Sequence, residues 1–173
     1  MTKETRISAV MGDIVDQPDC DGVVNSANEY LIAGSGVCGV IHKAAGPALE
    51  QYTRSYAPLE LGAAIASPGF NLANQWVIHV RGPRYLQDPE PARHLAQAVR
   101  SAIRVAEDCS VERLAIPAVS TGVYGYPIDE AAGILVQTAF QETKRRLGLK
   151  EIRFVLYSPT MYSFLSTEIS LLR

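Results

Sequence analysis

The sequence predicts an α/β sandwich built around a mostly parallel sheet. Short apolar runs bounded by turn residues alternate with longer segments whose apolar residues recur at helical spacing, a pattern typical of alternating strands and helices. Several short runs are apolar almost throughout, as expected of strands covered on both faces. With 173 residues, of which 47% are hydrophobic, the chain can bury a sizeable core, and we expect one domain over residues 1–173.

The expected strands cover residues 7–11, 22–24, 63–66, 76–80, 114–119 and 152–157. Four helices are expected between and after them. The first covers residues 37–45 and ends before Gly46-Pro47, and the second includes residues 92–106. The third includes residues 132–147, with a start signal at Pro127 and Asp129 and a stop signal at Gly148. The last begins after Ser158 and extends through residue 172.

The composition argues against several classes of partner, namely nucleic acid, a membrane and a metal ion. The formal net charge is −2 without a long basic run, which argues against a dedicated nucleic-acid surface. No segment approaches the length of a membrane span, and the N-terminus lacks the apolar core of a signal peptide. The three cysteines form no Cys-x-x-Cys pair, so we expect a cytoplasmic protein with neither a disulfide scaffold nor a metal site.

Two glycine-rich loops are the most informative feature of the chain. The first lies within residues 24–42, with glycines at 34, 36 and 39, and the second lies within residues 116–127, with glycines at 122 and 125; each follows an apolar run and opens a predicted helix. Glycine lets backbone N–H groups approach a ligand, and a helix N-terminus favours an anion. The first loop lacks the spacing of a dinucleotide fingerprint and has no Walker lysine. The pair of loops indicates a site that holds a diphosphate from two sides.

Polar segments follow four of the expected strands. They are residues 12–14, 25–38, 120–124 and 157–158. Ligands of open α/β sheets bind beyond the carboxyl ends of the strands. If these strands are parallel, all four segments line a single cleft.

Two kinds of polar residue in these segments have an alternative, local role. Asp13 can accept a hydrogen bond from an adenine amino group or cap a turn, and the turn preference of aspartate favours the second role. Asn25 and Asn28 can bind ribose hydroxyls or bond their own backbone. Tyr124 and Tyr157 lie in loops, where aromatic rings stack on a sugar or base or pack into the core.

Cys38 is expected at the start of a helix, where the pKa of a thiol falls. His42 lies four residues later on the same helix face and could serve as its base. A buried cysteine is more often a small packing residue, and a bound diphosphate would oppose a thiolate. We therefore favour a packing or ligand-lining role for Cys38 over a nucleophilic one.

The motifs together resemble the macro domain family of ADP-ribose-binding modules, in particular its MacroD-type branch. The resemblance extends from about residue 6 to about residue 160, and its motifs occur in the order of the family. They are residues 12–14, 24–28, 36–37, 41–46, 77–79, 82–83 and 117–127. It implies a three-layer α/β/α sandwich with a mixed, mostly parallel sheet of about six strands.

The resemblance also implies roles for individual residues. Asp13 would bind the adenine amino group, and the backbone of Ile14 an adenine ring nitrogen. Tyr157 would flank the adenine, and Asn28 would hold the distal ribose, with Tyr124 packed beside it. The residues that would wrap the diphosphate are Ser35, Gly36, Val37, Ser120, Thr121, Gly122, Val123 and Tyr124.

One position departs from the MacroD-type pattern. Those hydrolases carry aspartate within Gly-Val-Asp-Gly, where this chain has Cys38, and that aspartate is thought to position or activate the attacking water. Some viral macro domains that remove ADP-ribose have Gly-Val-Cys instead. Ala33 and Ser35 also replace glycines of the usual run, which should stiffen the loop.

The resemblance therefore implies an ADP-ribose-binding module that hydrolyses ADP-ribosyl esters, either on acidic side chains or in O-acetyl-ADP-ribose. Asn28, Gly36, Cys38 and Tyr124 are the candidate catalytic positions, and a phosphate of the substrate would accept the proton. A non-catalytic ADP-ribose reader and an ADP-ribose 1″-phosphate phosphatase are the alternatives. We expect a monomer without cofactor or metal. Its partners would be ADP-ribose or ADP-ribosylated protein, with nucleic acid only as an ADP-ribosylated substrate and no membrane.

Overall fold

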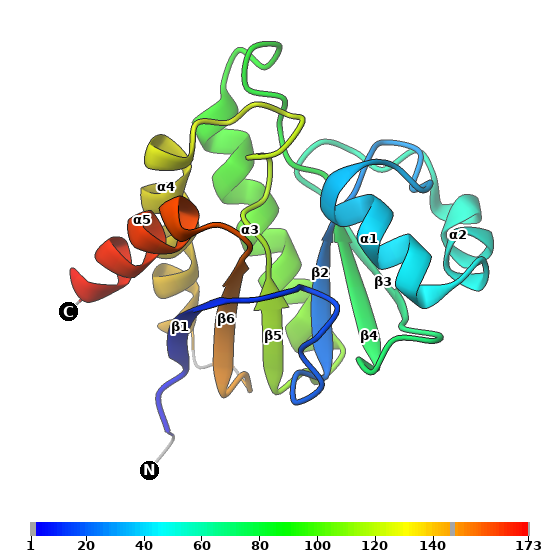
Figure 1. The fold of residues 1–173 in the computed structure, drawn as a ribbon, viewed down its shortest axis with the longest axis horizontal. Helices are drawn as coiled ribbons and strands as arrows, with labels where there is room; N and C mark the ends of the chain where they lie inside the picture. Colours follow the sequence, from blue (N-terminus) through cyan, green and yellow to red (C-terminus); the bar gives the residue numbers. More distant parts are fainter. Residues whose placement is uncertain (1–2, 146–147, 173) are drawn as a thin grey trace.

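A computed structural model describes residues 3–145 and 148–172. Strands and helices alternate along most of this chain (Figure 1). The strands are β1 (Arg6–Met11), β2 (Gly22–Ser26), β3 (Ala64–Pro68), β4 (Trp76–Val80), β5 (Arg113–Ile116) and β6 (Glu151–Leu156). The α-helices are α1 (Gly36–Ala45), α2 (Ala48–Thr53), α3 (Pro91–Asp108), α4 (Ile128–Thr143) and α5 (Pro159–Ser170), and a short 3-10 helix covers Arg54–Tyr56.

The strands form one sheet in the order β1-β6-β5-β2-β4-β3. Every neighbouring pair is parallel except β3 and β4, so the only antiparallel strand of this described sheet lies at its edge. β1 pairs with β6 from Arg6 opposite Glu151 to Met11 opposite Leu156. The expectation of a mixed, mostly parallel sheet of about six strands is therefore confirmed.

Helices cover both faces of the sheet. On one face, Ile41 and Ala45 of α1 and Leu49 of α2 pack against Val23 and Val77. On the other face, buried residues of α3, α4 and α5 form the larger apolar cluster with the opposite sides of the strands. Figure 1 shows α1 and α2 on one side of the sheet and the remaining helices on the other. This arrangement confirms the α/β sandwich that the sequence predicts and the three layers that the resemblance implies.

The ends of several elements differ from the prediction. β5 ends at Ile116 rather than at residue 119, because Pro117 has no N–H to donate to a neighbouring strand. α4 begins at Ile128 and ends at Thr143, and residues 146–147 of the predicted helix lie outside the described residues. The short helix α2 was not predicted. None of the helices in the described part of the chain is long and apolar enough to cross a bilayer.

The sheet creates a crevice between two neighbouring strands. β2 and β5 are adjacent and parallel, yet the chain leaves β2 toward α1 on one face and leaves β5 toward α4 on the other. Where consecutive connections leave a parallel sheet toward opposite faces, their loops separate and open a binding site. The two glycine-rich loops are these connections.

Candidate functional site

A cavity of about 580 Å³ opens at the carboxyl ends of the parallel strands. The four polar segments meet there, as the sequence predicts. Every binding or catalytic residue that the resemblance implies lines this cavity, namely Asp13, Ile14, Asn28, Ser35, Gly36, Val37, Cys38, Ser120, Thr121, Gly122, Val123, Tyr124 and Tyr157. Their individual contacts with a ligand remain predictions.

The first glycine-rich loop leaves the start of α1 free for a ligand. Ser35 stands before the helix, but its side chain makes no capping hydrogen bond, so the N–H groups of the first turn have no partner from it. Gly36 has a φ of 59°, a left-handed conformation that glycine adopts without strain. A Cβ on Gly39 would overlap the carbonyl oxygen of Gly34. The loop therefore packs closely against its own helix.

The second glycine-rich loop is closed by its own backbone. Tyr126 N–H donates to Ser120 O at 2.9 Å, and Gly125 N–H donates to Gly122 O at 3.0 Å. No protein acceptor is found among the described residues for the N–H groups of Gly122, Val123 and Tyr124. A Cβ on Gly122 would meet nothing within 4 Å. The loop thus presents free backbone donors to the cavity, a common way to bind phosphate.

Charged side chains contribute little to the cavity wall. Asp13 and Arg84 are the only charged residues among its described lining. An anion bound between the two loops would therefore depend on backbone N–H groups and on the start of α1.

Asp13 makes the local turn contact and also lines the cavity. Its Oδ1 accepts the N–H of Val15 at 3.1 Å, which is a turn contact, while the side chain is exposed and lines the cavity. Oδ2 has no partner among the described residues and is available to a ligand. Tyr157, which is 67% exposed, lies at the carboxyl end of the neighbouring strand.

The two asparagines have different positions. Asn28 lines the cavity, and its amide closes the loop through Nδ2 to Ile32 O at 2.8 Å and Ile32 N–H to Oδ1 at 3.2 Å. One amide hydrogen and one lone pair remain for a ligand. Asn25 is fully buried in β2, and its Nδ2 lies 3.1 Å from Nδ1 of His79. The suggestion that Asn25 binds ribose is therefore wrong.

Cys38 belongs to this buried network. Its Sγ donates to Ile32 O at 3.4 Å and lies 3.9 Å from the Nδ2 of Asn25. Burial raises the pKa of the Cys38 thiol, although donors from Asn25, Gly34 and Asn28 oppose this effect. The thiol is thus neutral near pH 7, whereas a helix N-terminus alone would favour the thiolate.

No Cys38–His42 hydrogen bond occurs in the described residues. His42 is buried, its Nε2 has no hydrogen-bond partner within the described residues, and burial lowers its pKa. His79 is fully buried between Asn25 and Ser67, whose Oγ lies 2.8 Å from Nε2. Burial lowers the pKa of His79 to about 3. The Cys38–His42 pair that the helical spacing suggested is therefore absent from this structure.

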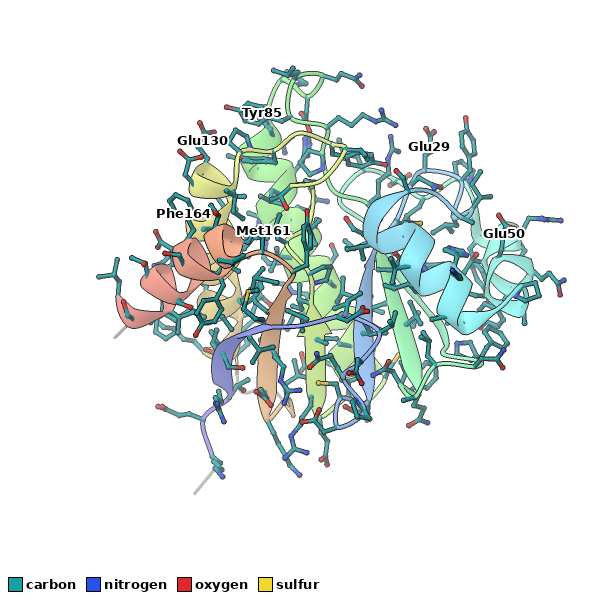
Figure 2. The ribbon with its side chains drawn as sticks, viewed as in Figure 1. Glu29, Glu50, Tyr85, Glu130, Met161 and Phe164 are labelled. Atoms are coloured by element: carbon teal, nitrogen blue, oxygen red, sulfur yellow. The ribbon has the colours of Figure 1, made fainter. Side chains whose placement is uncertain are left out.

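Arg84 is a cavity residue that the sequence analysis missed. Its guanidinium lies 4.7 Å from the ring centroid of Tyr124, a distance at which a cation is attracted to an aromatic face. Arg84 lies in the loop after β4, outside the four polar segments that point to the cleft, and Gly82-Pro83 is the signal that the sequence offers there. Also missed were Val40, Pro117, Ala118, Val155 and Met161, whereas Gly12, Ser26 and Gly34 lie in segments that the sequence placed at the cleft. Figure 2 labels Met161 at the end of the sheet where the cavity opens.

Comparisons with known proteins agree with this geometry. An O-acetyl-ADP-ribose deacetylase of Salmonella gallinarum is 36% identical over 172 residues, which cover 95% of this chain and 96% of the relative. The Oceanobacillus iheyensis macrodomain solved with ADP superposes with a TM-score of 0.91 at 34% identity, over 98% of this chain and 93% of that one. For the Trypanosoma brucei macrodomain with ADP-ribose, the TM-score is 0.85 at 27% identity, over 93% and 68% of the two chains.

A model of the family described as Macro domain matches residues 24–135, more than half of the chain and both glycine-rich loops. The match, the identity of the deacetylase relative and the fold agree, and the chain belongs to the macro domain family.

Proposed function

We propose that this macro domain binds ADP-ribose and hydrolyses ADP-ribosyl esters. The order of the strands is the observation that carries the proposal. The sheet order begins β1-β6-β5-β2. In that order, the cavity is lined by Asp13 after β1, Tyr157 after β6, the second glycine-rich loop after β5 and Asn28 after β2. Three spacings between neighbouring strands make about 14 Å. That distance suits an adenosine at one end, a diphosphate in the middle and a ribose at the other.

The relatives support this assignment of the cavity. The solved macrodomains hold ADP or ADP-ribose, and the Salmonella relative is named an O-acetyl-ADP-ribose deacetylase. Its name supports ester hydrolysis, with O-acetyl-ADP-ribose or an ADP-ribosylated acidic side chain as substrate.

The proposed reaction uses few protein groups. Water adds to the ester carbonyl carbon, and the bond from that carbon to the ribose oxygen breaks. A diphosphate oxygen of the substrate takes the proton from water and returns a proton to the departing ribose oxygen. Asn28 orients the distal ribose through its remaining amide hydrogen and lone pair, and Tyr124 packs beside it. Correct orientation alone can contribute several orders of magnitude in rate.

Cys38 shapes the site without acting as the base in this mechanism. Burial raises the pKa of its thiol, so it neither attacks the substrate nor removes a proton near pH 7. The same observation favours a second candidate function, a reader that binds ADP-ribose without turnover.

The test measures binding and turnover on the same preparations. Calorimetry with ADP-ribose should show binding, and O-acetyl-ADP-ribose and an ADP-ribosylated acidic acceptor should both release ADP-ribose. Asn28→Ala should lower kcat by about a hundredfold because orientation is lost. Asn71→Ala, an exposed residue outside the cavity lining, is the matched control.

Each alternative has its own outcome. ADP-ribose binding without turnover of either ester would identify a reader. Turnover restricted to ADP-ribose 1″-phosphate would identify a phosphatase. Either result would replace the proposed hydrolase.

A further inference from the structure

A second cavity of about 280 Å³ lies beside the first, beyond the carboxyl end of β4. Arg84 and Tyr124 line both cavities. Between them, a Cβ on Gly82 would overlap Ser120 Oγ, so the chain is packed closely there. The described lining of the second cavity also includes Glu29, Arg81, Gln87, Asp88 and His94.

The loop that walls the second cavity is held to the second glycine-rich loop. Tyr85 N–H donates to Tyr124 O at 2.9 Å, and the ring of Tyr85 lies 4.8 Å from that of Tyr126. The hydroxyl of Tyr85 donates to Glu130, at the start of α4, at 2.8 Å. Figure 2 shows Tyr85 and Glu130 close together at this end of the molecule. These contacts fix the position of Arg84 against Tyr124.

The carboxylates around the second cavity already have partners. Asp88 accepts from Glu90 N–H at 2.8 Å and lies 2.6 Å from His94 Nδ1. Glu29 lies 3.7 Å from Arg81, which also donates to Leu59 O. Arg84, by contrast, has no carboxylate within 4.0 Å among the described residues. The junction of the two cavities therefore carries an unneutralised positive charge.

We propose that the second cavity holds the acceptor part of an ADP-ribosylated protein, namely the modified side chain and the adjoining peptide, and that Arg84 favours an acidic peptide. This inference rests on the proposed function, which places the distal ribose beside Tyr124. A group joined to that ribose leaves the first cavity past Tyr124, where the second cavity begins. With ~30 Å³ for one liquid water, this cavity has room for about nine waters, several times the volume of an acetyl group. Its size and charge therefore suit a peptide better than O-acetyl-ADP-ribose.

Gln87 offers a test that leaves the first cavity intact. It is exposed and lines only the second cavity. Gln87→Lys adds a positive charge there, and Gln87→Glu adds a negative charge at nearly constant shape. Gln75→Glu is the matched control, since Gln75 is exposed and precedes β4 at the opposite end of the strand.

Calorimetry would compare free ADP-ribose with ADP-ribose joined through a stable linkage to an acidic peptide and to a neutral one. We expect Gln87→Lys to strengthen, and Gln87→Glu to weaken, binding of the acidic conjugate by about three- to tenfold. The neutral conjugate and free ADP-ribose should change by less than about twofold, as should every ligand with Gln75→Glu. Added salt should reduce the difference between the two Gln87 variants, because exposed charges are screened.

The inference and the proposed function fail in different ways. If the parent binds free ADP-ribose but the acidic conjugate does not respond to charge at position 87, this inference is wrong. It is equally wrong if all ligands respond by the same factor. If the parent does not bind free ADP-ribose, the proposed function fails and the inference fails with it.

Discussion

Gly122→Glu tests directly whether the second glycine-rich loop faces a diphosphate. Gly122 is exposed, lines the cavity and would accept a Cβ without contact within 4 Å. A carboxylate about 6 Å from each of two phosphate charges, at an effective dielectric constant of about 40, costs about 1.4 kcal/mol per charge. We therefore expect ADP-ribose affinity to fall by about 2–3 kcal/mol, or about 30- to 150-fold.

Gly122→Gln separates charge from bulk in this experiment because it has the shape of glutamate without its charge. Calorimetry at low and high salt should show a large, salt-dependent loss for Gly122→Glu and a smaller, salt-independent loss for Gly122→Gln. Thermal unfolding without ligand should change by no more than about 3 °C for either variant, since nothing surrounds the new side chain. Equal losses for both variants, or parental affinity of Gly122→Glu, would refute the placement of a diphosphate at this loop.

Three further predictions concern side chains. Asp13→Ala should weaken ADP-ribose binding by about 1.5–3 kcal/mol, the scale of a hydrogen bond to a charged group, and unchanged affinity by calorimetry with the fold intact would remove adenine recognition from this residue. Cys38→Ala should retain single-turnover release of ADP-ribose without a covalent intermediate, and Cys38→Asp should match or exceed the parent; inactivity of the alanine variant with binding retained would make Cys38 catalytic. The free energy of unfolding should fall as pH decreases from 6.5 to 5, because the pKa of His79 is about 3 in the folded protein and the unfolded chain therefore binds a proton at a higher pH. The expected decrease is up to about 1.4 kcal/mol per pH unit. Urea unfolding of the parent and His79→Gln would check this, and a flat parental profile would contradict it.

Local sequence patterns were sufficient to locate most strands and helices. β2 begins with a short apolar run, β4 is apolar except for His79, and both strands are largely buried between the helices of the two faces, so composition marks them. The strand order was not accessible from local patterns. β1 pairs with β6 across more than 140 residues of sequence, and only that pairing places Asp13 next to Tyr157.

Side-chain roles were harder to predict than loop positions. Asn25 and Asn28 have the same chemistry and lie three residues apart, yet one is enclosed in the sheet and the other lines the cavity. Strand alternation and the exact end of β2 decide between them, and element ends are poorly fixed by sequence. Arg84 was missed for a different reason: its place depends on a tertiary contact, Tyr85 N–H to Tyr124 O.

The proposed binding and the proposed catalysis depend on different parts of this site. In the proposed function, the anion binds to backbone N–H groups of two loops, which most side-chain substitutions leave unchanged. Position 38, in contrast, is surrounded by donors: the Asn25 amide and the backbone of Gly34 and Asn28. A neutral thiol uses these donors weakly, at the 3.9 Å separation from Asn25, whereas a carboxylate there would accept them strongly and stay ionised.

His79 fixes the orientation of the Asn25 amide. His79 accepts from Nδ2 only as the tautomer whose Nε2–H donates to Ser67 Oγ, and its lowered pKa keeps the ring neutral. The buried residues Ser67, His79 and Asn25 therefore supply an amide donor to position 38 whether cysteine or aspartate occupies it. We therefore expect Cys38→Asp to change turnover more than ADP-ribose affinity, so affinity alone does not distinguish a reader from a hydrolase in this fold.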